Sequence, residues 1–419
     1  MRIGRWLQLG VSPRPVARPF DPIFMNAFLS IILCAGFAFL VGCSTTSPQQ
    51  TASSPQLPEG VRVLPVGAKW QEVFDASEGS SEWEAKTYET GPNDVSFDVT
   101  LVDPIFPDMA GLPYSVVLQK DARGFPLEYR MFLRTGVCLD GTCKLLEATL
   151  FWDALGRFAR FEYPQGAPFT KTEHDPFTDA EYKQLHEFMA DTRSILGTHP
   201  LSFFVVEPNK AGGGDWDSES SATPPDAKAA VIEGAAYTTW VLWRWIHGEV
   251  VGQLLAKTNE NLSDDYLLEC LRSDDSAFVQ FALKHLQMQG LTDERLYRAS
   301  LEIFEERGQR DCILALDVLT AHSEDLAQLH VDLIPRIGVN GGSSRVLLNY
   351  FKTLTTADVA VWRKMAAQVD RMSEYRDIDI TFGILRQQAL QDPEVRAQVS
   401  RFQKSEDPFM KRRAESFLQ

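Results

Sequence analysis

The sequence predicts an α+β domain over residues 60–255, followed by an all-α, solenoid-like domain over residues 260–419. Two observations carry this prediction. Short strand-like runs dominate up to about residue 165, and turn residues separate them. From Leu262 onward, apolar residues recur three and four positions apart in short runs that polar residues interrupt. Strands that are followed by helices in this way are typical of an α+β protein.

The clearest strand is Val95–Leu101, which alternates apolar and polar side chains. Further strands are predicted on both sides of two turns, 121–124 and 153–156, and we place them at Ser115–Gln119, Phe125–Leu133, Lys144–Trp152 and Gly156–Tyr163. A first helix is expected after Thr178, because Glu181 stands three residues later and completes a capping box.

A second helix is predicted to begin at Pro225, since proline suits a first helical turn. It would end at His247-Gly248, and its buried face would carry Ile232, Ala236, Trp240, Trp243 and Ile246. Thr223 would then stand at the N-terminus of this helix, where unpaired N–H groups favour a phosphate. The tryptophans and Tyr237 suit core packing, and the alternative is a surface for an aromatic ligand.

Capping residues precede several helix-like runs in the C-terminal part of the chain. They are Ser263-Asp264-Asp265, Ser273-Asp274-Asp275, Thr292-Asp293-Glu294, Thr356-Ala357-Asp358, Asp392-Pro393-Glu394 and Asp407-Pro408. Helix pairs at intervals of about 30 to 40 residues resemble an irregular solenoid of the HEAT type. An irregular helical bundle is the alternative. The region offers a surface for a protein partner, and Cys270 and Cys312 either pair or stay buried.

The formal net charge of −16 argues against binding to nucleic acid, which requires basic residues to neutralise phosphates. Residues 1–42 contain four arginines and one aspartate, so the remaining chain has 37 basic and 56 acidic side chains. Such an acidic surface avoids anionic lipids, and a membrane attachment would therefore be covalent or inserted.

The N-terminus has the features of a secretion signal, because a basic stretch precedes the apolar run Ile23–Val41. Leu40-Val41-Gly42-Cys43 resembles the lipobox of bacterial lipoproteins. The resemblance implies a signal peptide over residues 1–42, a lipid on Cys43 and a location on the periplasmic face of the outer membrane, since Ser44 is not Asp. The alternative is an uncleaved membrane anchor. Residues 43–59 are expected to form a flexible polar tether.

The stretch Asp217-Ser218-Glu219-Ser220-Ser221-Ala222-Thr223 resembles the flavinylation motif of the FMN-binding domain family, which includes the covalent-flavin subunits of sodium-pumping NADH:quinone reductases and nitrous-oxide regulatory flavoproteins. The resemblance implies that a flavin transferase esterifies FMN to Thr223. Asp217, Ser220 and Ala222 match the other specified positions, whereas Ser221 replaces a common glycine. The alternative is that these residues only cap a helix.

The segment 171–178, with His174, resembles a block in secreted bacterial proteins that carry Ser-Gly-Ala-Thr further on and a Cys-x4-Cys before it. Here Cys138 and Cys143 have this spacing, and we expect a disulfide that closes a hairpin loop. A redox-active pair is the alternative. His174 either contacts the flavin or caps a turn. A metal site made of both cysteines, His174 and His186 fits no common zinc pattern.

Together these observations predict a lipid-anchored extracytoplasmic flavoprotein that passes electrons between unknown redox partner proteins, with the FMN supplying the chemistry. A second reading, from another class, is a non-catalytic surface lipoprotein that binds protein partners through its helical repeats. A thiol-redox protein that uses Cys138 and Cys143 is a third reading.

Overall fold

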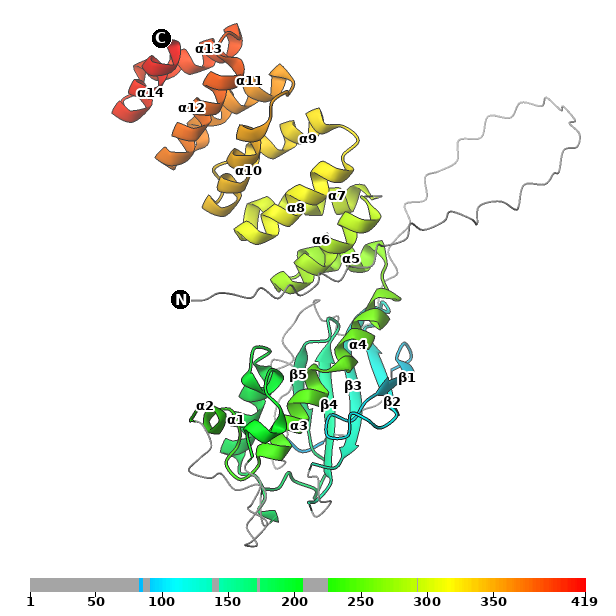
Figure 1. Cartoon of the computed structure of the whole chain (residues 1–419). Coiled ribbons are helices and arrows are strands. Elements are labelled where there is room, and N and C mark those ends of the chain that lie inside the picture. Colours follow the sequence, from blue (N-terminus) through cyan, green and yellow to red (C-terminus); the bar gives the residue numbers. More distant parts are fainter. Residues whose placement is uncertain (1–82, 86–90, 138–142, 172–173, 206–224, 292) are drawn as a thin grey trace, which may run out of the picture. The chain divides into compact units, whose positions relative to one another are not determined.

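A computed structural model gives the fold and describes residues 83–85, 91–137, 143–171, 174–205, 225–291 and 293–419. Within them, a five-stranded antiparallel sheet is followed by a mostly helical region (Figure 1). The predicted order of an α+β region and then an all-α region is therefore confirmed. The predicted signal peptide, Cys43 and the tether over residues 43–59 lie outside the described residues. In the described part, no helix has the length and apolarity needed to cross a membrane.

The sheet is a meander in which the strands lie side by side in the order β1-β2-β3-β4-β5. Their bounds, β1 (Val95–Leu101), β2 (Leu112–Lys120), β3 (Pro126–Thr135), β4 (Leu146–Asp153) and β5 (Phe158–Glu162), confirm the five predicted strands to within a few residues. The two predicted turns contain Gly124 at φ 84° and Gly156 at φ 72°. Glycine adopts this left-handed backbone without the steric cost of a Cβ.

Helices cover one face of the sheet. They are α1 (Asp179–Ala190), α3 (Ala236–His247) and α4 (Glu249–Asn259). Trp152 of β4 donates its indole N–H to the carbonyl of Ile246 at 2.9 Å, which fixes α3 on the sheet. The predicted capping box of α1 is confirmed, because Thr178 and Glu181 each bind the other's backbone N–H. This region has its own apolar core, which runs from Trp83 to Leu254.

A glycine allows α4 to follow α3 directly. Gly248 caps α3, as predicted, but its φ is −80° rather than positive. A Cβ at this position would lie 2.5 Å from the carbonyl oxygen of Arg244, which is closer than any real Cβ contact. Close approach of the backbone therefore explains the glycine.

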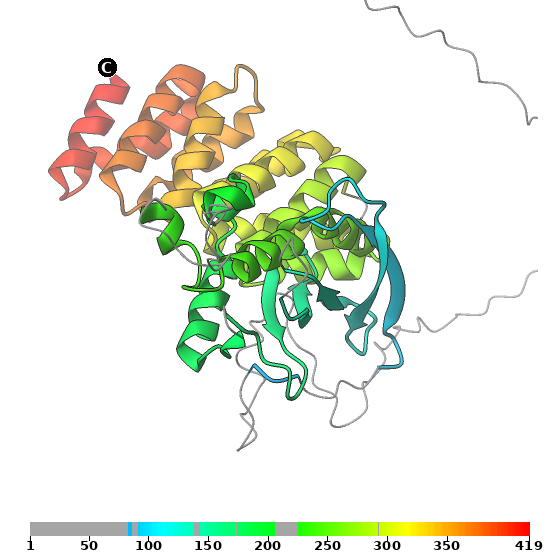
Figure 2. The same cartoon turned by 60° about the horizontal axis from the view of Figure 1, so that its bottom comes forward.

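The all-α region is a succession of helices that pack on their near neighbours in sequence (Figures 1 and 2). The helices are α5 (Asp264–Arg272), α6 (Ser276–Gln289), α7 (Glu294–Glu306), α8 (Gln309–His322), α9 (Leu326–Leu333), α10 (Gly341–Thr353), α11 (Val359–Gln368), α12 (Tyr375–Ala389), α13 (Pro393–Ser400) and α14 (Pro408–Leu418). Contacts join α6 to α8, α8 to α10, α10 to α12 and α12 to α14, and likewise α5 to α7, α9 to α11 and α11 to α13. The helices thus form two layers.

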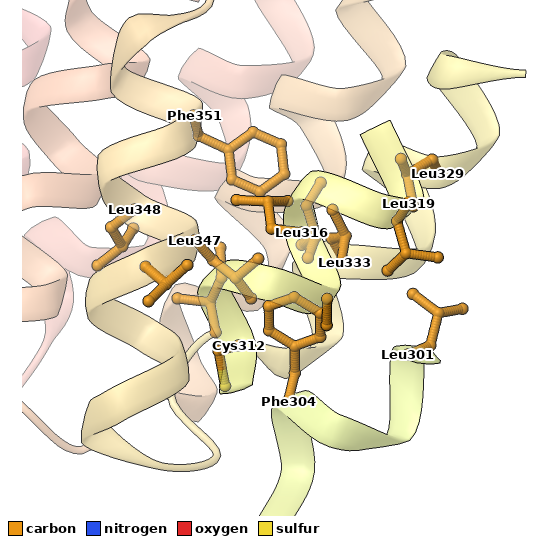
Figure 3. Close-up of a cluster of buried hydrophobic side chains, with 14 of the residues drawn as sticks. Leu301, Phe304, Cys312, Leu316, Leu319, Leu329, Leu333, Leu347, Leu348 and Phe351 are labelled. Carbon is orange, nitrogen blue, oxygen red and sulfur yellow. The ribbon is translucent and has the colours of Figure 1, made fainter. Parts of the chain in front are cut away.

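All six predicted capping segments precede a helix. Their N-cap side chains accept a backbone N–H from the first turn, and they are Ser263, Asp275, Asp293, Asp358, Asp392 and Asp407. The core between the layers is apolar, and Figure 3 shows side chains of α7, α8, α9 and α10 meeting in it. Phe304 and Phe351 are fully buried there.

Two turns of the sheet contact the first helices of the all-α region. Arg157, in the β4–β5 turn, pairs with Asp275 at 2.6 Å, and Arg123, in the β2–β3 turn, pairs with Glu269 at 3.3 Å. Lys120 donates to the side chain of Asn261 at 2.6 Å. These contacts attach the end of the sheet that carries both turns to α5 and α6.

Candidate functional site

The predicted flavin residues Asp217, Ser220, Ser221, Ala222 and Thr223 all lie outside the described residues. The structure does describe the two points between which this stretch runs. On one side, Phe204 and Val205 are buried in the apolar core. On the other side, α2 (Pro225–Ala229) begins two residues after Thr223, and its Ala227 is fully buried. Both flanks of the motif are thus fixed on the α+β region.

The predicted continuous helix from Pro225 to His247 is wrong. α2 ends at Ala229, and the tryptophan-containing helix α3 begins only at Ala236. Between them Gly234 has φ 73°, and the Ile232 N–H donates to the hydroxyl of Thr239 at 3.2 Å. The apolar periodicity continued across this turn because Val231 and Ile232 are buried in the same core as α3. Thr223 therefore does not stand at the start of the tryptophan helix, and the dipole of that helix cannot favour a phosphate there.

The tryptophans of α3 are packed in the core, which confirms the favoured interpretation. Trp240 donates its indole N–H to the carbonyl of His199 at 3.0 Å, and Trp243 donates to that of Asp191 at 3.1 Å. Gly197 leaves room for Trp243, because a Cβ there would lie 2.5 Å from the indole ring. These rings join α3 to the segment after α1, and they are not free to stack on an isoalloxazine.

His247 belongs to the same arrangement. Its Nε2 lies 2.7 Å from the carbonyl oxygen of Met189, and its ring packs on Trp243 with centroids 4.5 Å apart. Burial lowers the pKa of His247 from its ordinary value, although the Met189 carbonyl and Asp191 act in the opposite direction. His247 is therefore a structural, neutral side chain near pH 7.

Arg244 is a basic residue of α3 that has no part in the predicted flavin site. Its Nη2 donates to the carbonyl of His199 at 3.2 Å, and the guanidinium lies 4.9 Å from the centre of the Trp240 ring. Burial lowers its pKa. Among the described residues no carboxylate pairs with it, and its Nε is buried without a hydrogen-bond partner. The sequence signal for this residue is a single cation in an otherwise apolar helix.

His174 lies on the surface in a tight turn. Its φ of 64° is left-handed, which is uncommon for a residue with a Cβ. The His174 N–H donates to the carbonyl of Lys171 at 3.0 Å, and the Lys171 N–H donates to that of Asp175 at 2.7 Å. Of the two roles predicted for His174, the structure shows the turn, and contact with a flavin stays a prediction.

His186 lies elsewhere, packed beside Trp83 and Phe158 with its Nε2 3.1 Å from the carbonyl of Ala159. In the part of the chain that the structure describes, no three His, Cys, Asp or Glu side chains group as a metal site would require.

The cysteines that the structure describes fall into two kinds. Cys143 is disulfide-bonded, and its predicted partner Cys138 lies outside the described residues, so that pairing stays a prediction. Cys270 and Cys312 are free and buried rather than paired. Burial raises the pKa of Cys270 to about 12 and that of Cys312 to about 11. Since the thiolate is the reactive form, neither thiol is a nucleophile at neutral pH.

No known protein family, curated protein or solved structure matches this chain.

Proposed function

We propose that the protein is a lipid-anchored, extracytoplasmic flavoprotein that carries FMN on Thr223 and passes electrons between partner proteins. The observation that carries this proposal is the motif Asp217–Thr223, which stands in a chain with a lipobox ending at Cys43. A covalent bond suits this location, because a free flavin nucleotide would be lost outside the cytoplasm. The partners are a flavin transferase for maturation and redox proteins on either side of the transfer.

The fold supports the proposal through the flanks of the motif. The stretch of 19 residues between Val205 and Pro225 is attached at both ends to one buried core, so a group on Thr223 would stay close to the α+β region. When bound, FMN supplies transfer of one or two electrons. The chain's contribution is to hold this group outside its own core, because Trp240 and Trp243 are covered and do not fit as a stacking surface.

Intact-mass spectrometry after co-expression with a flavin transferase tests the proposal. We expect a mass increment of one FMN less the water lost in forming the phosphoester, and a fluorescent band in a denaturing gel. Both should be absent in Thr223→Ala. The matched control is Thr198→Ala, which removes an exposed hydroxyl outside the motif and should leave both signals unchanged. An unmodified peptide across residue 223 in protein from its own host would overturn the proposal.

The second candidate is a scaffold lipoprotein, and the all-α region favours it. Five side chains donate to backbone carbonyls 33 to 36 residues earlier, and they are Arg307, Arg336, Asn340, Gln368 and Gln388. This recurrence supports a solenoid of the HEAT type, whose repeats offer an extended surface to a protein partner. If Thr223→Ala complements a deletion of the gene as well as the wild type does, the scaffold is favoured over the electron carrier.

A further inference from the structure

The two layers of helices in the all-α region differ in charge. We refer to α6, α8, α10, α12 and α14 as the even layer and to α5, α7, α9, α11 and α13 as the odd layer (Figure 1). The even layer contains nine Lys or Arg and five Asp or Glu, whereas the odd layer contains six Lys or Arg and nine Asp or Glu. Two of the five acidic residues in the even layer, Asp311 and Asp377, are buried. A chain with a formal net charge of −16 thus has a basic surface on one layer.

The exposed side chains of the even layer lie on the side away from the odd layer. α6, α8, α12 and α14 pack on α5, α7, α11 and α13, and α10 packs on the short helix η5 (Ile334–Arg336) that follows α9. Exposed residues of an even helix recur three or four positions apart, as Arg345, Asn349 and Lys352 do in α10. This spacing places them on one side of the helix. Because consecutive even helices are neighbours, their exposed sides join into one surface, which we call the even face.

The N-terminal ends of the even helices lie side by side. Ser276, the first residue of α6, donates its hydroxyl to Asp311, the third residue of α8, at 2.5 Å. Ser344 in the first turns of α10 likewise hydrogen-bonds the side chain of Asp377, the third residue of α12. These contacts make the helices of each pair parallel. Side chains at the same level of successive even helices therefore form a row across the even face.

Six exposed cations of the even face form no ion pair with a described residue. They are Arg310, Arg345, Lys352, Arg376, Arg386 and Arg412. Four of them lie within the first five residues of their helices, and we call these four, Arg310, Arg345, Arg376 and Arg412, the N-terminal row. Asp377 is the carboxylate that acts on Arg345 and Arg376, but it is buried and engaged by Ser344. The N-terminal row thus consists of exposed guanidinium groups without a paired carboxylate.

The odd layer handles its cations differently. Arg295 pairs with Asp265 at 2.8 Å, and Arg298 pairs with Glu294 at 2.8 Å. Arg363 pairs with Asp392 of the next odd helix, also at 2.8 Å. Since the same chain neutralises the basic residues of one layer and leaves those of the other unpaired, the charge of the even face is not a general property of this helical region.

We infer that the even face binds an acidic segment of a partner polypeptide, whose carboxylates pair with the N-terminal row. The inference does not depend on the flavin proposed for Thr223. Neighbouring helices lie about 8–10 Å apart, so the row from α8 to α14 spans about 30 Å. An extended chain covers this length with about nine residues. Each guanidinium can hold a carboxylate through two parallel N–H donors, and about every third residue of the segment would meet one.

The limited extent of the even face favours a short segment over a larger polyanion. Exposed carboxylates lie beside the N-terminal row, in the connections that lead into the even helices, and they include Glu306, Glu374 and Glu406. At physiological ionic strength the screening length is about 8 Å, so a ligand responds to the charges near its own contacts. A membrane or a duplex nucleic acid would extend past the row and meet these carboxylates, whereas a segment of about nine residues would not.

Fluorescence anisotropy tests the inference, with the purified full-length protein and a fluorescein-labelled peptide of about ten glutamates, at about 0.15 M salt. We expect binding that weakens as salt is raised, and a loss of affinity of about fivefold or more in the double variant Arg345→Gln/Arg376→Gln. The matched control is Arg272→Gln/Arg298→Gln, which removes two exposed cations of the odd layer and changes the net charge equally. This control should bind the peptide as the wild type does.

Carbodiimide cross-linking of the wild type gives a second measurement that needs no variant to fold. We expect the peptide carboxylates to be joined to Lys352 of the even face and not to Lys364 of α11.

Four results would overturn the inference. They are the absence of peptide binding at this salt, equal weakening in both double variants, cross-links at Lys364 without Lys352, and equally tight binding of phosphatidylglycerol vesicles or duplex DNA through Arg345 and Arg376. None of these results bears on Thr223, because the mass measurement decides the flavin separately.

Discussion

Thr258→Val is the most informative substitution for the packing of α4 on the sheet. Thr258 is fully buried, and its hydroxyl donates to the carbonyl of Ala154 at 2.5 Å. The Tyr129 hydroxyl lies 2.7 Å from the hydroxyl oxygen of Thr258. Since the Thr258 proton is used by Ala154, Tyr129 must donate to Thr258. Three elements, β3, the β4–β5 turn and α4, are thus connected through one hydroxyl.

The direction of these hydrogen bonds sets the magnitudes. Valine has nearly the shape of threonine, so Thr258→Val leaves the Tyr129 hydroxyl and the Ala154 carbonyl buried and unpaired. At about 1–3 kcal/mol for each of these two groups, the free energy of unfolding should fall by about 2–6 kcal/mol. Tyr129→Phe removes a donor and leaves Thr258 its bond to Ala154, so it should cost only about 1 kcal/mol. The stability that the double variant loses should be smaller than the sum of the losses in the two single variants. The reason is that the double variant leaves one buried group unpaired, whereas Thr258→Val alone leaves two.

Urea unfolding followed by circular dichroism measures these differences. The control is Thr320→Val, because the Thr320 hydroxyl bonds back only to carbonyls of its own helix, those of Leu316 and Asp317. Its loss should change stability by less than about 0.5 kcal/mol. The reasoning is refuted if Tyr129→Phe costs as much as Thr258→Val, which would mean that the donor direction is reversed. Strict additivity in the double variant would refute the coupling.

Three further predictions concern other parts of the fold. Gly248→Ala should destabilise the protein by more than about 1 kcal/mol in thermal unfolding, because its Cβ would meet the backbone of α3. Gly252→Ala in α4 has open space around it and should be neutral or stabilising by about 0.5–1 kcal/mol. Equal effects of the two substitutions would contradict this prediction. Because burial lowers the pKa of His247 in the folded protein, the unfolded state takes up the proton at a higher pH than the folded state does. The stability of the wild type relative to His247→Gln should therefore decline as pH falls below 6.5. A stability difference that does not change with pH would exclude this. Asn340 caps α10 through its side-chain oxygen and donates to the carbonyl of Phe304 through its amide nitrogen. Asn340→Ala should therefore cost about 1–2 kcal/mol of stability, and Asn340→Asp should cost less because aspartate keeps the cap. An equal loss of stability in both variants would show that the cap contributes little.

Local signals in the sequence predicted local structure well. The strand Val95–Leu101, the capping box at Thr178 and the caps of the all-α region depend on side chains that are neighbours in sequence, and each was found where it was predicted. The candidate site was less accessible to this reasoning. An apolar period of three and four predicted one helix from Pro225 to His247, but the period only requires burial on one side, and a turn at Gly234 meets that requirement equally well.

By itself, the sequence determined the order of strands and helices, the acidic balance, and the two motifs that end at Cys43 and Thr223, because these depend on residue type and short spacing. Only the tertiary structure decided that Trp240 and Trp243 are covered, that Arg244 has no carboxylate partner among the described residues, and that Arg310, Arg345 and Arg376 lie on one face of one layer of helices. The physical reason is that exposure and pairing depend on residues far apart in the chain, whose approach is set by strand register and helix packing.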